Sequence, residues 1–243
     1  MCRHLAWLGA PRTLADLLLD QPSSLRRQSY APRRQHHGRV NADGWGVGWW
    51  TSAAPTPERW RSATPMWSHA SLAAVAPHVS STCILAAVRS ATPGMPIEEA
   101  ASAPFAHGEW LLSHNGRVDR SVLPPTAWPA AESVCDSAVL ATHLLSAPAA
   151  LAERIAAVGF ADPAARLNVL LADGTQLLAT TWGDTLAVLV TADGVAVASE
   201  PYDDDPRWRD VPDRSLLTVT ASGVAVHDLP DPRGETVAEM ENR

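Results

Sequence analysis

Residues 2–8 read Cys-Arg-His-Leu-Ala-Trp-Leu, and the cysteine directly after Met1 decides how the rest of the chain is interpreted. The small side chain of Cys2 permits removal of Met1, which leaves a thiol and a free α-amine on one Cα. Such a pair supplies a nucleophile and its base, as an N-terminal threonine does in other enzymes. Reference pKa values of about 8 for the amine and about 8.5 for the thiol suit proton exchange near neutral pH. The stretch predicts a nucleophilic enzyme, although a chance cysteine in a first strand also fits these residues.

Length and composition favour one globular unit. The chain of 243 residues can form one large domain or two small ones with a substantial core. Its hydrophobic fraction of 46% and charged fraction of 19% are those of an ordinary globular protein. No shift in composition marks a boundary, so we expect a single α+β domain over residues 2–243. In this domain Met1 is removed and the last residues are frayed.

Charge and cysteine usage exclude several classes of partner. A formal net charge of -7 argues against nucleic acid or an anionic membrane as a partner. The chain has no apolar run of membrane-spanning length and no signal-peptide core, which predicts a cytoplasmic protein. Cys2, Cys83 and Cys135 form no disulfide framework and no metal motif, so we expect a reducing compartment and neither metal nor other cofactor. Oligomeric state is left open.

Hydrophobic periodicity predicts the order of strands and helices. After a turn at residues 9–11, Thr13 is placed to cap a helix over 14–19. Short alternating runs split by Asp-Gly or Ser-Gly are a strong hairpin signal, and three such hairpins follow residue 166. Their turns lie at 173–174, 193–194 and 222–223. Other strands are expected at 2–8, 58–63, 83–88 and as a pair over 105–113, and other helices at 71–78, 134–145 and 149–158.

Two charged residues stand at the ends of predicted elements, and each has a structural and a functional interpretation. Arg89 ends the apolar strand 83–88 and offers a planar fork for a carboxylate. The same position suits a buried structural ion pair. Asp136 opens a predicted helix, where it offers an anion for an ammonium group or serves as the helix N-cap.

Two further motifs contain glycine. One reads His114-Asn115-Gly116, and the other, at 43–46, reads Asp-Gly-Trp-Gly. The Asn115 amide and the Gly116 backbone N–H can donate to a developing oxyanion. A type I′ hairpin turn explains the same dipeptide. The glycines of the motif at 43–46 allow close approach of a backbone or ligand and predict a pocket wall. His4 and His114 are interpreted as structural donors within strands.

In their order along the chain, at 2, 43–46, 89–92, 114–118 and 136–137, these motifs resemble those of class II glutamine amidotransferase domains, which belong to the N-terminal-nucleophile hydrolases. The resemblance covers nearly the whole chain, from Cys2 to the Ser-Glu-Pro segment at 199–201. It implies a four-layer αββα sandwich of two antiparallel sheets flanked by helices. In finer detail the residues around 2–11, 27–35 and 41–49 resemble the γ-glutamyl hydrolases of ergothioneine biosynthesis.

The resemblance also implies a role for each matched residue. Cys2 attacks a γ-glutamyl carbonyl carbon to form a thioester, and its own amine transfers the proton. The other roles are oxyanion donors for Asn115 and Gly116, and substrate binding for Arg89, Asp136, Thr92 and Trp45. Two positions depart from the family pattern: Ala87 and Ala138 stand where histidine and glutamate are frequent.

Three functions remain open at this point. The first is an amidohydrolase that releases glutamate from a γ-glutamyl conjugate of a betaine-bearing thiohistidine precursor. The second is a glutaminase subunit that supplies ammonia to a separate synthase, and the third is a binding module that retains only the fold. Ten tryptophans favour the first, because aromatic faces attract a trimethylammonium group by about 0.5–2 kcal/mol.

Overall fold

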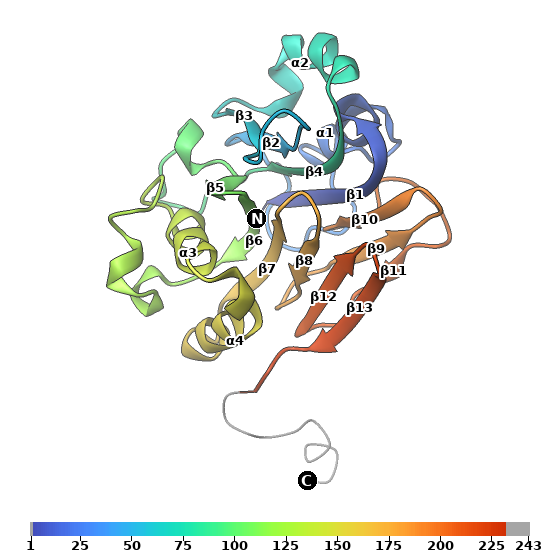
Figure 1. Ribbon diagram of the computed structural model, residues 1–243. Coiled ribbons are helices and arrows are strands. Elements are labelled where there is room, and N and C mark those ends of the chain that lie inside the picture. Colours follow the sequence, from blue (N-terminus) through green and yellow to red (C-terminus); the bar gives the residue numbers. More distant parts are fainter. Residues whose placement is uncertain (1, 232–243) are drawn as a thin grey trace.

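The computed structural model describes residues 2–231, and the expectations about Met1 and the frayed chain end concern residues outside this range. Two antiparallel sheets form the middle of the molecule (Figure 1). Sheet A has the strand order β11 (Arg209–Asp210), β9 (Ala187–Val190), β10 (Gly194–Ala198), β1 (Arg3–Thr13), β4 (Ser80–Val88), β2 (Trp45–Trp49) and β3 (Glu58–Ser62). Sheet B has the order β13 (Gly223–Asp228), β12 (Ser215–Thr220), β8 (Leu177–Thr180), β7 (Arg166–Ala172), β6 (Trp110–Arg117) and β5 (Phe105–His107).

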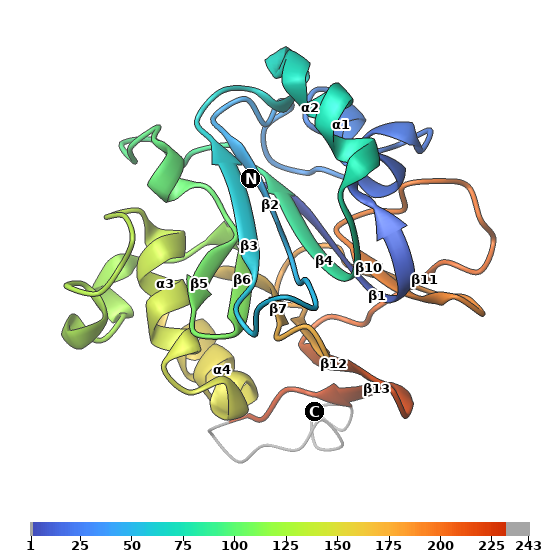
Figure 2. The same ribbon diagram turned by 45° about the horizontal axis from the view of Figure 1, so that its top comes forward.

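Helices cover the outer face of each sheet (Figures 1 and 2). On sheet A lie a π-helical segment (Asp16–Asp20), α1 (Leu25–Gln28) and α2 (Ala70–Val75), and on sheet B lie α3 (Asp136–Leu145) and α4 (Leu151–Ala161). Short 3-10 turns occur at Met66–Ser68, Ala76–His78, Glu99–Ala101, Arg120–Val122, Pro125–Ala127 and Pro148–Ala150. The expected αββα sandwich is confirmed.

Alternation along the strands divides the buried side chains into three clusters, one for each interface between layers. Leu5 and Trp7 of β1 join the helix-covered outer face of sheet A, whereas Ala6 faces the space between the sheets. Strand β4 alternates in the same way and is buried on both faces, as its apolar sequence predicts. Each fully buried large aliphatic side chain contributes about 1.5–3 kcal/mol. Strands β1 and β4 are therefore anchored by buried side chains on both faces of sheet A.

The structure corrects the predicted turn at residues 9–11. Strand β1 continues to Thr13, and a shift of register against β4 between Leu8 and Arg12 absorbs the glycine and proline. Such a bulge places an extra residue in one strand without ending it. Thr13 still accepts the N–H of Asp16 through its Oγ1 at 3.1 Å, so its predicted capping contact is confirmed.

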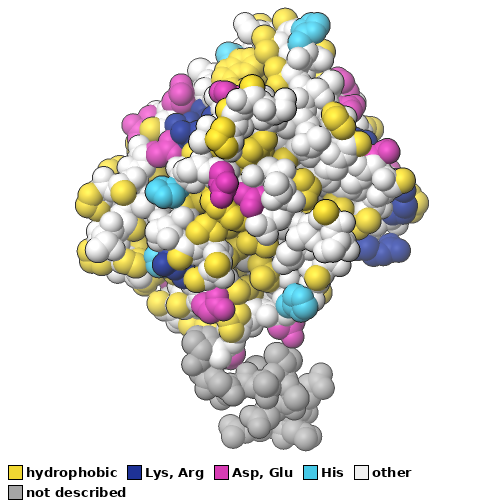
Figure 3. Space-filling view, in the orientation of Figure 1, with side chains coloured by type: hydrophobic (Ala, Val, Ile, Leu, Met, Phe, Trp, Pro, Cys, Tyr) yellow, Lys and Arg dark blue, Asp and Glu magenta, His cyan; other side chains and the backbone are white. Residues whose placement is uncertain are grey.

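The three predicted hairpins are confirmed as the pairs β7–β8, β9–β10 and β12–β13. No single helix within residues 2–231 has both the length and the apolar composition to cross a membrane. The segments 136–145 and 148–161 reach that composition only together, and they are bent by 109° relative to each other. On the face shown in Figure 3, basic and acidic side chains are interspersed.

Candidate active site

Strand register brings the sequence motifs to one end of the sheets. Because β1 and β4 are antiparallel, Arg3 at the start of β1 lies opposite Val88 at the end of β4. Strand β10 is also antiparallel to β1, and its last residue, Ala198, lies opposite Leu5. Cys2 is therefore next to the segment that leaves β4, and its Sγ is 4.0 Å from the Ser90 carbonyl oxygen.

The Cys2 side chain is half-buried and lines a small pocket. The pocket encloses about 10 Å³, which is room for one water molecule. The remaining lining residues are Trp45, Ala87, Val88, Arg89, Ala101, Ala103, Phe105, His114 and Ser137.

Arg89 is held by the glycine-rich motif. Its backbone N–H donates to Gly44 O (2.7 Å), its Nη1 donates to Asp43 O (3.3 Å), and its carbonyl accepts the Asp43 N–H (2.9 Å). The Asp43 carboxylate accepts the Ala91 N–H at 2.8 Å. Gly44 has φ +127°, a conformation that favours glycine. Among residues 2–231 no carboxylate pairs with Arg89, so the ion-pair interpretation is wrong and the buried guanidinium is free to bind an anion.

Asp136 is the first residue of α3 and is 4% exposed. The helix N-cap is Cys135, so the N-cap interpretation of Asp136 is wrong; its Oδ2 instead accepts the Val118 N–H at 3.3 Å. Burial raises the pKa of Cys135, Arg89 opposes this shift and Asp136 adds to it, which places both charges close to that thiol. No described cation pairs with Asp136. One unpaired cation and one unpaired anion thus lie near the same helix start.

Asn115 lies inside β6, opposite Asn168 of β7, so the hairpin-turn interpretation is wrong. Its side chain is fully buried, with Nδ2 3.3 Å from Ser199 Oγ and Oδ1 without a hydrogen-bond partner among the described residues. A side chain at Gly116 would collide with the carbonyl oxygen of Arg166. Glycine is therefore required by the close β6–β7 approach and not by a turn.

The two histidines near Cys2 are buried within the strands. His114 Nδ1 lies 2.9 Å from Ser137 Oγ and its Nε2 lies 2.8 Å from Arg166 O, whereas His4 Nδ1 lies 3.2 Å from Ser113 Oγ. Burial lowers the pKa of both rings below the ordinary histidine value, and neighbouring Arg3 and His114 lower that of His4 further. Both are therefore neutral near pH 7. The contacts of His114 agree with its interpretation as a structural donor.

Of the other two predicted substrate-binding residues, Trp45 lines the Cys2 pocket and Thr92 does not. Thr92 belongs to the segment after β4, and its carbonyl accepts the Met95 N–H. Trp45 lines the Cys2 pocket, but its ring packs against Trp60 and His69 with centroids 5.3 and 5.2 Å away. Contact of either side chain with substrate stays a prediction.

Known sequences identify the family of this chain. Residues 19–193 match the class II glutamine amidotransferases. The chain belongs to this family. Over 235 residues it is 60% identical to a protein of Mycobacterium tuberculosis named gamma-glutamyl-hercynylcysteine sulfoxide hydrolase, covering 96% of this chain and 99% of that one. A protein of the same name from Mycolicibacterium smegmatis is 61% identical over 230 residues, covering 94% and 100%.

A solved class II amidotransferase supports the architecture. The glutamine aminotransferase class-II domain protein of Silicibacter pomeroyi superposes with a TM-score of 0.66 at 26% identity, covering 94% of this chain and 100% of that one. The two departures from the amidotransferase pattern are both buried but line different pockets: Ala87 lines the Cys2 pocket, and Ala138, at the start of α3, lines a neighbouring cavity.

A larger cavity of about 320 Å³ lies on the other side of Phe105. Its walls include Glu132, which is already paired with Arg59 and Arg61, and they contain no cysteine. Within residues 2–231 no group of three or more His, Cys, Asp or Glu side chains is arranged to hold a metal ion. Cys2, the predicted nucleophile, thus lines the smaller pocket.

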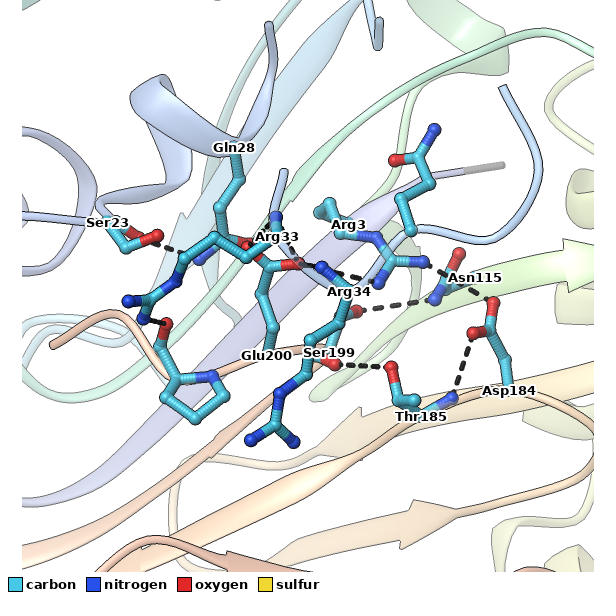
Figure 4. Close-up of polar contacts among 12 residues, drawn as sticks. Arg3, Ser23, Gln28, Arg33, Arg34, Asn115, Asp184, Thr185, Ser199 and Glu200 are labelled. Carbon is cyan, nitrogen blue, oxygen red and sulfur yellow. Dashed lines mark hydrogen bonds and ion pairs between the residues drawn. The ribbon is translucent and has the colours of Figure 1, made fainter. Parts of the chain in front are cut away.

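Sequence analysis missed a buried ionic network behind Cys2 (Figure 4). The Arg3 Nε donates to the Cys2 carbonyl at 2.7 Å, and its other nitrogens lie 3.4 Å from Asp184 Oδ2 and 4.0 Å from Glu200 Oε2. Glu200 in turn accepts the N–H groups of Arg33 and Arg34. The signal in the sequence was the charged residue directly after the nucleophile in an otherwise apolar strand.

The three free cysteines are expected to react very differently with a glutamine-mimicking electrophile. Burial raises the pKa of Cys83 to about 12 and also raises that of Cys135, so neither forms a thiolate near neutral pH. Intact-mass measurement should find one label, on Cys2 of chains that lack Met1. The Cys2→Ser variant is the control and should remain unlabelled. Label on Cys83 or Cys135 alone, or full activity in chains that keep Met1, contradicts the assignment.

Proposed function

We propose that this protein hydrolyses a γ-glutamyl amide bond through an N-terminal cysteine thioester and releases glutamate. The substrate we propose is γ-glutamyl-hercynylcysteine sulfoxide. The observation that supports the proposal is a pocket lined by Cys2 and Arg89 together with His114 and Ser137, the sequence neighbours of Asn115 and Asp136. Neither Arg89 nor Asp136 has an ion-pair partner among residues 2–231. The choice of leaving group is supported by the names of relatives that match over nearly their whole length.

The charges fit the two ends of a glutamyl group. Its α-carboxylate suits the Arg89 fork, because paired N–H donors match the two oxygens, and its α-ammonium suits Asp136. Both side chains are buried, which makes their attraction for a charged ligand stronger than at an exposed site. Anchoring at this end directs the γ-carbonyl toward the Cys2 sulfur.

The chemistry proceeds in two steps. The Cys2 sulfur attacks the γ-carbonyl carbon, and the thiol proton passes through the Cys2 amine to the departing nitrogen as the C–N bond breaks. Asn115 and the Gly116 N–H stabilise the negative oxygen of the tetrahedral intermediate. A water molecule then attacks the thioester, which yields glutamate and restores the thiol.

We further propose that residues 2–243 form one catalytic domain that works in the cytoplasm. Three free cysteines support a reducing compartment. A small-molecule substrate is consistent with the pocket that Cys2 and Arg89 line. The proposed reaction requires neither metal nor other cofactor.

Glutamate release by the purified protein tests the function directly. We expect the γ-glutamyl conjugate of hercynylcysteine sulfoxide to be hydrolysed at least about tenfold faster than glutamine at equal concentration, which corresponds to about 1.4 kcal/mol of extra transition-state binding. The Cys2→Ala variant, which lacks the sulfur, should release none from either. Equal or faster turnover of glutamine, especially when a second protein stimulates it, would instead identify an ammonia-supplying subunit.

A further inference from the structure

Ser199 follows directly after β10 and is fully buried between the nucleophile strand and β6. Its backbone N–H donates to the His4 carbonyl at 2.9 Å, and its Oγ accepts the His4 N–H at 3.1 Å. The same Oγ lies 3.3 Å from the Asn115 amide (Figure 4). One hydroxyl therefore touches both the backbone next to Cys2 and the proposed oxyanion donor.

With the Asn115 amide atoms as assigned, one donor and one acceptor near this hydroxyl lack hydrogen-bond partners among the described residues. Ser199 Oγ receives two donors, His4 N–H and Asn115 Nδ2, so its own proton has no acceptor within residues 2–231. Asn115 Oδ1 is a buried acceptor with no partner. An unsatisfied buried polar atom costs about 1–3 kcal/mol, and two occur here side by side.

Exchanging the amide oxygen and nitrogen of Asn115 gives both the Ser199 hydroxyl proton and the Asn115 oxygen a partner. These two atoms are nearly indistinguishable by position and are assigned from their hydrogen bonds. In the exchanged orientation Ser199 O–H donates to Asn115 Oδ1, while Ser199 Oγ still accepts the His4 N–H. The amide NH₂ then becomes the group without a protein partner.

We infer that Ser199 is a positioning residue that holds the Asn115 amide with its NH₂ group free for the oxyanion. This inference rests on the proposed function, in which that oxyanion forms on the γ-carbonyl. The Thr185 hydroxyl donates to the Ser199 carbonyl oxygen at 2.8 Å. This bond fixes the backbone of Ser199 and thereby the position of its side-chain hydroxyl. The nucleophile strand and the oxyanion donor thereby share one anchor.

Steady-state kinetics of Ser199→Ala test this role. An Asn115 amide that loses its orientation stabilises the transition state less but leaves the substrate charges bound, so kcat should fall about 10- to 100-fold with KM nearly unchanged. Ser199→Thr keeps the hydroxyl and should recover most of kcat. The matched control is Ser81→Ala, which removes a buried hydroxyl bonded to Trp50 and Cys83 near the opposite end of β4.

A double-mutant cycle separates positioning from general destabilisation. In the Asn115→Ala background, Ser199→Ala should cause no further loss of kcat, because the group that it orients is already gone. If Ser199→Ala does not fold, Ser199→Cys carries the same comparison, since a thiol is a much weaker hydrogen-bond donor.

The outcomes distinguish this inference from the proposed function. Additive losses of kcat in the cycle, or a Ser199→Ala variant with unchanged kcat beside a slow Asn115→Ala variant, overturn the inference alone. An Asn115→Ala variant with unchanged kcat removes the proposed oxyanion role itself.

Discussion

Asn115→Ala is expected to lower kcat for the γ-glutamyl substrate by about 10²–10³-fold with little change in KM. Removal of one oxyanion donor has an effect of this size because the bond forms fully only when the carbonyl oxygen becomes negative. The role fits the burial of Asn115 in β6 and the amide orientation inferred above, in which the NH₂ group has no partner among the described residues. Single-turnover measurement of the acylation step is the sharpest assay, because it separates bond cleavage from product release.

Two variants serve as controls for this result. Asn115→Asp keeps the size of the side chain but replaces its donor with an acceptor, and it should be as slow as the alanine variant. Arg89→Ala should fail differently, with a raised KM, because in the proposed mechanism the guanidinium binds the substrate carboxylate in the ground state as well as in the transition state. An Asn115→Ala enzyme that retains kcat within about threefold of the original would contradict the oxyanion assignment.

Local patterns predicted most of the fold, and they failed where a distant contact decides the structure. Asn-Gly is the same signal in a type I′ turn and in β6, and what selects the strand is the close approach of Arg166 O to Gly116. At residues 9–11 glycine and proline mark a turn, but pairing with β4 on both sides turns them into a bulge. Neither pairing is visible within a short window of sequence.

The candidate site shows the same division. Arg89 and Asp136 stood out because each lies at the end of a predicted element, and both lie close to Cys135 at the start of α3, while their roles stay predictions. Arg3 and Glu200 were missed because each matters only through partners far along the chain, Asp184 and the segment at 33–34. The same holds for Ser199, whose hydroxyl contacts residues from two other strands.

Arg3→Ala is expected to lower the free energy of unfolding by about 3–5 kcal/mol, the usual loss when one partner of a buried ionic group is removed. Arg3 is fully buried, and burial lowers its pKa while the charges of Asp184 and Glu200 oppose that shift. Without the guanidinium, two buried carboxylates lose their shared counter-charge, and the Cys2 carbonyl loses the donor that fixes it. Urea unfolding followed by circular dichroism measures the difference.

The loss of stability should arise because Arg3 is buried, since an exposed arginine carries the same charge. Arg207→Ala removes an exposed arginine paired with Asp205 and should leave the free energy of unfolding unchanged within error. Adding Asp184→Asn to Arg3→Ala should restore part of the stability, because one of the two uncompensated carboxylates then becomes neutral. Equal stability of the Arg3→Ala and Arg207→Ala variants would show that the network contributes nothing to folding, and the Cys2 backbone would then have to be held by the strand pairing of β1 alone.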